Sequence, residues 1–159
     1  NGLNMSAKEL NVEMSGATSA NITGEFDSAE IEMGGAAKCD FDISAGKLDQ
    51  ELSGAAKAYY TRDFESVYVE ASGASVFSFK GNANYMNIEG SGAAKIETSK
   101  GSAKEVKASI SGAAYCEINA LDKLQVDASG GGSVRYVDNA NLKLDIRSIS
   151  RGASVTRMR

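Results

Sequence analysis

A Ser-Gly-Ala tripeptide, or a close variant of it, recurs along the whole chain at nearly equal intervals. The steps between its glycines are 19, 19, 19, 19, 20 and 18 residues, and these glycines are Gly16, Gly35, Gly54, Gly73, Gly92, Gly112 and Gly130. A degenerate eighth copy occupies residues 150–155, and its serine follows Ser129 by 21 residues, which predicts an extra residue held in a β-bulge. A fixed period of this kind indicates a repeat architecture in which each unit packs on the next.

Aligning the units on their glycines gives columns of equivalent residues. The column six residues before the glycine consists of Leu10, Ala29, Leu48, Val67, Met86, Val106, Leu124 and Leu144. The columns two and four residues further along are also mainly apolar, the second of them ending at Ser148, and the positions between are mainly polar. A period of two residues predicts a β-strand with one buried face before each glycine.

A second alternating stretch follows each glycine, and a looser segment completes the unit. The second stretch places one inward column at Ala20, Cys39, Ala58, Phe77, Ile96, Cys116 and Val134. The looser segment is rich in Gly, Asn and Asp and carries about one apolar residue per unit, for example Phe26, Ala45, Phe64, Ala83 and Leu121. We therefore expect two strands joined by a glycine corner, and a return that forms a short third side or an arc.

This organisation predicts an all-β fold, a single-stranded right-handed β-helix (β-solenoid) with about eight coils of 19 residues. The unit is too short for a helical repeat, and parallel crossovers favour the right-handed sense. We expect one domain over residues 1–159, with a partial first coil at 1–9, regular coils at 10–143 and a degenerate C-terminal coil at 144–159. Leu3 matches the column of Ile22 and Phe41, so the chain begins in the middle of a coil.

The glycine corner has a physical cause. A tight turn between two strands needs a positive φ angle or a close approach of two backbones, and glycine permits both. A glycine-rich phosphate cradle is disfavoured because no helix follows any of these glycines. We expect the two sheets to come closest at the alanines directly after the glycines, which are Ala17, Ala36, Ala55, Ala74, Ala93 and Ala113.

The composition excludes several classes of site. The sequence has no His, no Trp and no Pro, which excludes Ser-His-Asp and Cys-His catalysis and zinc or haem held by His; no cofactor is expected. Its 17 Lys and Arg against 21 Asp and Glu give a formal net charge of −4, which argues against a nucleic-acid partner. No apolar run approaches the roughly 18 residues of a membrane span, and no signal peptide is visible.

One outward column is acidic in five consecutive coils. It consists of Glu13, Glu32, Glu51, Glu70 and Glu89, followed by Ser109 and Asp127. Like charges facing each other on neighbouring strands destabilise a sheet, so the ladder is either solvated and splayed or it binds cations or a cationic ligand. Hard cations such as calcium take carboxylate oxygens, but the Asp-rich loop of a calcium site is absent, and no metal site is assigned.

Other side chains could bind a ligand or act in catalysis. Three outward tyrosines, Tyr59, Tyr68 and Tyr115, are candidates for stacking on a glycan. Cys39 and Cys116 share an inward column four coils apart, about 19 Å, too far for a disulfide, so we expect free buried thiols. A polysaccharide-degrading enzyme would need a cluster of acids and bases, for which the sequence offers Arg62 beside Asp63 and the lysines Lys38, Lys57 and Lys95.

The repeat resembles the bacterial putative auto-transporter adhesin, head GIN domain family. The resemblance is strongest over residues 124–136, which read L-Q-V-D-A-S-G-G-G-S-V-R-Y before the terminal copy at 150–155, and it extends over about 10–159. The chain departs from the family pattern in lacking the further N-terminal β segment and in having Val137-Asp138-Asn139 where the family has a glycine. The resemblance implies a secreted or surface-attached protein of a Gram-negative bacterium and supplies no catalytic residues.

These observations favour a non-enzymatic, adhesin-like binding module that presents a regular β-helix face, located extracellularly, at the cell surface or in the periplasm. Its partner would be a host or bacterial glycan or protein. Two alternatives stay open. One is a pectin-lyase-like enzyme that degrades polysaccharides, and the other is a bactofilin-like structural solenoid that polymerises as a homo-oligomer through its end coils.

Overall fold

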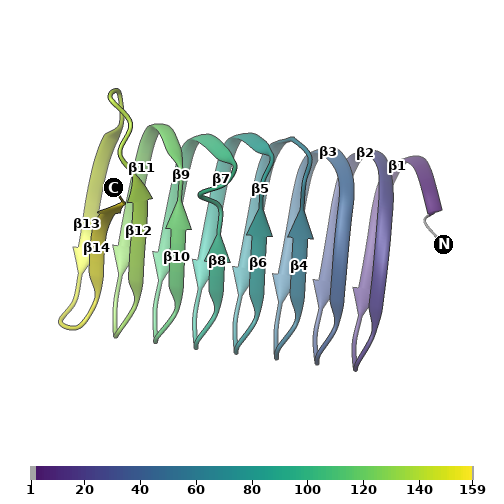
Figure 1. The fold of residues 1–159 in the computed structure, drawn as a ribbon, viewed down its shortest axis with the longest axis horizontal. Helices are drawn as coiled ribbons and strands as arrows, with labels where there is room; N and C mark the ends of the chain where they lie inside the picture. The colour runs from purple at the N-terminus through teal and green to yellow at the C-terminus, as the bar shows by residue number, and fades with distance from the viewer. Residues whose placement is uncertain (1–2, 159) are drawn as a thin grey trace.

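The computed structural model describes residues 3–158, and it is built from β-strands and turns, with no helix among the residues it describes. The described chain accordingly holds no helix that is long and apolar enough to cross a membrane. Figure 1 shows the strands side by side along one axis. The strands are β1 (Leu3–Met14), β2 (Ser19–Met33), β3 (Lys38–Leu52), β4 (Lys57–Tyr60), β5 (Phe64–Ala71), β6 (Val76–Phe79), β7 (Asn82–Gly90), β8 (Lys95–Glu97), β9 (Ser102–Ile110), β10 (Tyr115–Ile118), β11 (Ala120–Ala128), β12 (Ser133–Val137), β13 (Lys143–Ile149) and β14 (Ser154–Met158).

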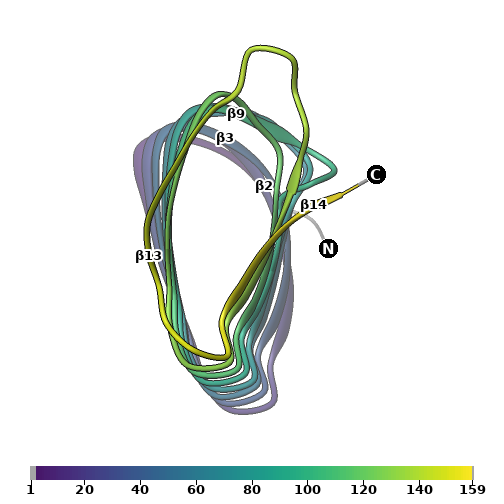
Figure 2. The same cartoon turned by 90° about the vertical axis from the view of Figure 1, so that its left-hand side faces the viewer.

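Equivalent residues of successive units lie directly beside one another, as the sequence period predicts. Leu48 pairs with Ala29 on one side and with Val67 on the other, and every neighbouring pair of strands in the solenoid is parallel. Seen from the C-terminal end, the chain turns counterclockwise as it advances toward the viewer, so the solenoid is right-handed (Figure 2). The expected β-solenoid is therefore confirmed, and Leu3 pairs with Ile22 as expected for a partial first coil.

Each coil has two sides rather than three. The strands that precede the corner glycines form the first sheet, and the strands that follow these glycines form the second sheet; a tight corner joins the two at one edge and a rounded arc joins them at the other (Figure 2). In the early coils, β2 and β3 run without a break from the second sheet through the arc into the first sheet. The looser third of the unit is thus an arc, one of the two forms expected.

The corner glycines have the left-handed backbone that their position in a tight turn requires. Their φ angles lie between 63° and 68° from Gly16 to Gly130, and Gly152 in the degenerate copy has a φ of 92°. Successive corners also touch, because a Cβ atom added to Gly73 would lie 2.6 Å from the carbonyl oxygen of Gly54. Both the backbone angle and the stacking therefore exclude a side chain.

The alanines directly after the corner glycines are exposed, which corrects the expectation that they lie where the sheets converge. In the regular coils the buried position is one residue later. It is fully inaccessible at Ala37, Ala56, Ser75, Ala94 and Ala114. The reason is the left-handed glycine, which turns the next side chain outward and only the following one into the wedge between the sheets.

The core fills the space between the two sheets with the inward apolar side chains of successive coils, from Leu10 to Val134. In the arc, the expected column continues from Ala83 to Ala103 and Ala120. Leu121, which the sequence offers as an apolar residue of this segment, lies one position after the buried Ala120 and is 38% exposed. The pairing of β11 with β9 shifts register between Ala120 and Lys123, and this shift displaces Leu121 outward.

The degenerate last coil contains the predicted bulge. Ile146 pairs with Val126, but the next pair is Ser148 with Asp127, so Arg147 is the extra residue. Ile149 therefore takes the inward position beside Ala128, and the assignment of Ser148 to the buried face is corrected to the outward face. The inward side chains of β13 are only partly covered, Leu144 being 37%, Ile146 42% and Ile149 47% exposed.

Candidate functional site

The acidic residues of the outward column form a continuous ladder on the first sheet. Glu13, Glu32, Glu51, Glu70 and Glu89 are paired in register on neighbouring strands, and the column continues through Ser109, Asp127 and Ser148. Strand spacing places consecutive members about 4.8 Å apart at the backbone. The five glutamates are exposed, and within the described residues none of them makes an ion pair or a side-chain hydrogen bond.

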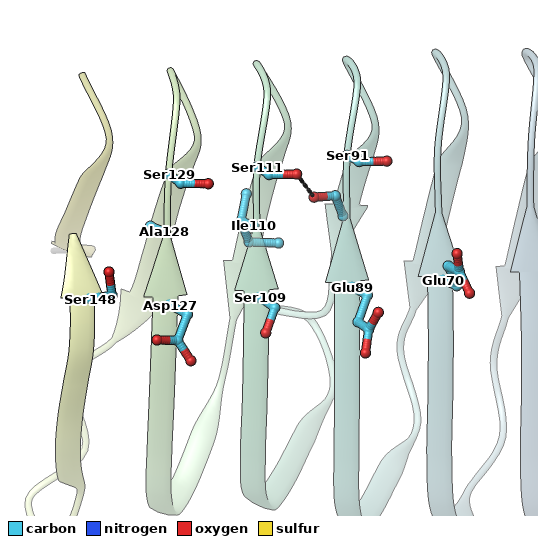
Figure 3. Close-up of a pocket in the computed structure, with 11 residues that line it drawn as sticks. Glu70, Glu89, Ser91, Ser109, Ile110, Ser111, Asp127, Ala128, Ser129 and Ser148 are labelled. Atoms are coloured by element: carbon cyan, nitrogen blue, oxygen red, sulfur yellow. Dashed lines mark hydrogen bonds between the residues drawn. The ribbon is translucent and has the colours of Figure 1, made fainter. Parts of the chain in front are cut away.

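The ladder is interrupted by a hollow of about 440 Å³ that extends from Glu70 on β5 across β7, β9 and β11 to Ser148 on β13. Ser109 occupies the position that is glutamate in five other coils, and its shorter side chain leaves space between the carboxylates of Glu89 and Asp127 (Figure 3). A second row of hydroxyls from the corners borders the hollow, at Ser91, Ser111 and Ser129 (Figure 3). The Ser111 hydroxyl donates a 3.4 Å hydrogen bond to the Gly90 carbonyl.

The hollow therefore presents carboxylates and hydroxyls that have few partners of their own. Within the described residues, neither Glu89 nor Asp127 is paired with a cation, and the hydroxyl of Ser109 makes no hydrogen bond. The ladder is a row and not a cage, since nowhere in residues 3–158 do three His, Cys, Asp or Glu side chains converge closely enough to hold a metal ion. Its chemistry suits a ligand that donates several hydrogen bonds.

The sequence pointed to the ladder but not to the hollow. Three of the Ser-Gly-Ala serines, Ser91, Ser111 and Ser129, border the hollow. The signal that could have located it is the break in the acidic column at Ser109, next to the small residues Gly90 and Ala128.

The three candidate tyrosines do not form one patch. Tyr68 lies on β5 in the first sheet, whereas Tyr59 on β4 and Tyr115 on β10 lie in the second sheet. Three strand spacings separate β4 from β10, about 14 Å. Each of the three rings is half-buried. Lysines sit over two of them, Lys38 Nζ at 5.6 Å from the Tyr59 centroid and Lys47 Nζ at 5.1 Å from that of Tyr68.

Tyr115 belongs to a polar network on the second sheet. Its hydroxyl donates a hydrogen bond to Glu117, and Arg135 donates one of 3.3 Å to the same hydroxyl. The hydroxyl of Ser99 donates a further hydrogen bond of 2.9 Å to Glu117. These bonds, the Tyr115 bond foremost, hold the pKa of Glu117 below its usual value, with Arg135 and Lys95 adding attraction.

A shallow hollow of about 230 Å³ lies beside Tyr59, between two outward columns of the second sheet. Tyr59 and Asp40 belong to one column, and Asp42 and Thr61 to the next. Asp42 receives hydrogen bonds of 2.5 and 3.1 Å from Arg62 and a longer one, 3.4 Å, from the Thr61 hydroxyl. The Arg62 hydrogen bonds hold the pKa of Asp42 below its usual value.

The residues that an enzyme of the polysaccharide-degrading type would use are dispersed. Arg62 is paired with Asp42 rather than with Asp63, and Asp63 accepts hydrogen bonds from the backbone and side chain of Asn82. Lys95 forms a 2.7 Å ion pair with Glu97. These contacts make separate surface pairs, and they do not assemble the expected acid and base cluster.

The two cysteines are free and buried, as the sequence predicts. Burial raises the pKa of the Cys39 thiol to about 12, and burial likewise raises the pKa of Cys116. Because the thiolate is the reactive form, these residues pack as small apolar side chains and offer no nucleophile.

Two crystal structures share this fold. A putative adhesin from Parabacteroides merdae ATCC 43184 aligns with a TM-score of 0.79 and 19% sequence identity, covering 96% of this chain and 64% of that chain. A putative adhesin from Bacteroides fragilis NCTC 9343 aligns with a TM-score of 0.68 and 11% identity, covering 95% of this chain and 92% of that chain. The chain thus spans 64% of the length of the Parabacteroides protein. No curated protein matches the chain.

The family profile described as putative auto-transporter adhesin, head GIN domain, matches residues 28–140. That segment holds the corner glycines from Gly35 to Gly130 and most of the acidic ladder. The chain therefore belongs to the putative auto-transporter adhesin, head GIN domain family.

Proposed function

We propose that this protein is a non-enzymatic, adhesin-like binding module, secreted or displayed at the cell surface, and that it holds its ligand on the acidic face of the first sheet. The observation that carries the proposal is the hollow at Ser109, where unpaired carboxylates flank a hydroxyl-bearing floor. Membership of the adhesin family and the fold shared with two putative adhesins support the same reading.

The chemistry of this face defines the ligand class. Ionised carboxylates only accept hydrogen bonds, and serine hydroxyls both donate and accept. Glu89 and Asp127 lie two strands apart, so a ligand bound across Ser109 can reach both. The complementary partner is rich in donors, such as a polyhydroxylated glycan or the lysine and arginine side chains of a protein. An acidic partner would be repelled.

Binding of the purified domain to immobilised neutral glycans and to a lysine-rich peptide tests the proposal. A triple variant, Glu70→Gln, Glu89→Gln and Asp127→Asn, removes the charges around the hollow but keeps the size of the side chains. The matched control is Glu13→Gln with Glu32→Gln, which alters the same ladder outside the hollow.

We expect the triple variant to lose binding to the lysine-rich peptide by at least about tenfold, since several charge-assisted hydrogen bonds disappear together, and the control to bind the peptide as the unaltered domain does. Equal loss in both variants would point to diffuse electrostatics in place of a site. A domain that binds neither probe would overturn the proposal.

A structural solenoid that associates through its end coils is the second candidate. The observation that favours it is the row of partly exposed apolar side chains on β13, where Leu144, Ile146 and Ile149 lie at an unpaired sheet edge. Such an edge is a template for another chain. Sedimentation at increasing protein concentration should then show a rising mass that Ile146→Lys prevents, and a constant monomer mass would contradict this candidate.

A further inference from the structure

We propose that the hollow beside Tyr59 binds one pyranose ring of a neutral sugar. This site lies on the second sheet, across the solenoid from the acidic ladder, and it is separate from the binding face proposed above. The inference combines the Tyr59 ring, the side chains of Asp40 and Asn21, which have no partner among the described residues, the Asp42 carboxylate held by Arg62, and a cavity of limited size.

The aromatic ring is the first element of the site. Tyr59 projects outward from β4 and is half-buried, so its ring is fixed at the base but reaches the hollow. An aromatic face attracts partly positive hydrogens, and the C–H face of a pyranose provides them. Lys38 Nζ lies over the ring, 5.6 Å from its centroid, and Lys38 is not among the residues that line the hollow.

The polar side chains are the second element. In the same outward column, Asp40 lies beside Tyr59 and Asn21 lies on the far side of Asp40, and both line the hollow. Within the described residues neither of these two side chains makes a hydrogen bond or an ion pair. Their oxygen and nitrogen atoms are therefore free to bond with sugar hydroxyls. Thr23 borders the hollow as well.

Asp42 is the pre-organised member of the set. Arg62 donates one hydrogen bond to each of its two carboxylate oxygens, and the Thr61 hydroxyl donates a third. A carboxylate held this way keeps one orientation, yet its two oxygens have further lone pairs for a ligand. Pre-organisation lowers the entropy that binding must overcome.

The size and charge of the hollow select the ligand. Its volume of about 230 Å³ is below the roughly 300–1,000 Å³ of pockets for drug-sized molecules, so it accepts one ring of a chain. Asp42 is paired with Arg62, but Asp40 lines the hollow without a cationic partner among the described residues, so a sugar that carries a carboxylate is disfavoured there. A neutral hexose or N-acetylhexosamine satisfies both requirements.

An immobilised panel of neutral, N-acetylated, uronate-containing and sialylated oligosaccharides, probed with the purified domain, tests this inference. The variant is Tyr59→Ala. The matched control is Tyr68→Ala, because Tyr68 is also a half-buried outward tyrosine with a lysine over its ring, but it borders neither hollow. Tyr59→Phe, which keeps the ring, accompanies them, and thermal unfolding verifies that each variant is folded.

The expected result is binding to neutral or N-acetylated sugars that weakens by at least about tenfold in Tyr59→Ala, the loss typical of a truncated aromatic anchor, and that persists in Tyr68→Ala and in Tyr59→Phe. Asp42→Asn should weaken the same signal. Absence of sugar binding, binding only to acidic sugars, or equal losses in Tyr59→Ala and Tyr68→Ala would overturn the inference.

The ladder variants separate this inference from the proposed function. The triple variant at Glu70, Glu89 and Asp127 should leave the Tyr59-dependent signal unchanged, because those residues lie on the opposite sheet. Sugar binding that disappears in the triple variant and survives in Tyr59→Ala would overturn the inference while supporting the ladder face.

Discussion

The hydroxyl of Tyr60 donates a hydrogen bond to the side-chain carbonyl oxygen of Gln50 across the interior of the solenoid, and this bond joins the two sheets. Gln50 occupies an otherwise apolar inward column between Ile31 and Val69. It is 1% exposed, and its amide nitrogen donates to the carbonyl oxygens of Ile31 and Glu51 at 3.1 and 3.0 Å. A buried polar group is tolerated because every part of it has a partner.

Tyr60→Phe should destabilise the domain by about 1–3 kcal/mol, because it leaves the Gln50 oxygen buried and unpaired. Gln50→Leu should also destabilise it, by removing the acceptor of the Tyr60 hydroxyl. The double variant should lose less free energy of unfolding than the sum of the two single variants, since no orphaned partner remains across the core. Urea denaturation measures all three, and simple additivity would contradict the pairing.

Gly73→Ala should destabilise the domain by at least about 2 kcal/mol. An alanine there adopts a φ of +67° with strain, and its Cβ lies 2.6 Å from the Gly54 carbonyl oxygen. Gly131→Ala is the matched control in another corner, where the nearest atom is 3.4 Å away, and we expect it to change stability by less than about 0.5 kcal/mol. Chemical denaturation of both variants checks this, and similar losses would contradict the corner geometry.

Ser75→Ala should stabilise the domain by about 1 kcal/mol. The Ser75 hydroxyl is fully buried and has no hydrogen-bond partner among the described residues, in a column where most other units have alanine. Removing an unpaired buried hydroxyl recovers its desolvation cost. Ser72→Ala is the control, because Ser72 donates a 3.2 Å hydrogen bond to the Leu52 carbonyl and should be neutral or destabilising. A lower melting temperature for Ser75→Ala would indicate a partner for this hydroxyl.

The geometry of the corner explains why the sequence alone predicts the register of the coils. Each corner needs a residue with a positive φ angle, so the spacing of the glycines shows which residues are equivalent in successive coils. The inward columns then follow from the alternation of side chains along each strand. The arc has no such requirement. There the compensating steps of 20 and 18 residues shift the register, so the apolar residue Leu121 is exposed and Ala120 takes the buried position.

The candidate sites were predicted less completely than the fold. The ladder follows from register alone, and so does the separation of Tyr68 from Tyr59 and Tyr115, because these residues come from different strands of the unit. The hollows do not follow from register. They depend on the lengths of neighbouring side chains, such as the short Ser109 between Glu89 and Asp127. They also depend on how the Tyr59 side chain lies relative to Asp40 and Asp42.

The stability of the domain should fall in acid partly through Glu117. Its pKa is lowered in the folded state, mainly by the hydrogen bond from Tyr115 and also by the bond from Ser99 and by Arg135. A lowered folded-state pKa contributes stability that is complete above the ordinary value of about 4.5 and is lost as the pH falls through the folded-state pKa.

Urea midpoints measured from pH 7 to pH 3 test this contribution. Glu117→Gln should be less stable than the unaltered domain at neutral pH, and the difference should shrink below about pH 4.5. Glu30→Gln, which alters an exposed carboxylate without a hydrogen bond among the described residues, serves as the control. A difference between Glu117→Gln and the unaltered domain that stays constant with pH would contradict the lowered pKa.

The acidic ladder should oppose folding at low ionic strength. Glu51 faces Glu32 on one side and Glu70 on the other, so Glu51→Gln should raise the melting temperature by about 1–3 °C. The gain should fade in molar salt, where the Debye length is about 3 Å.

If the ladder is solvated, millimolar calcium at matched ionic strength leaves the melting temperature of the unaltered domain unchanged. A calcium-dependent rise that disappears in Glu51→Gln with Glu70→Gln would instead demonstrate cation binding by these carboxylates.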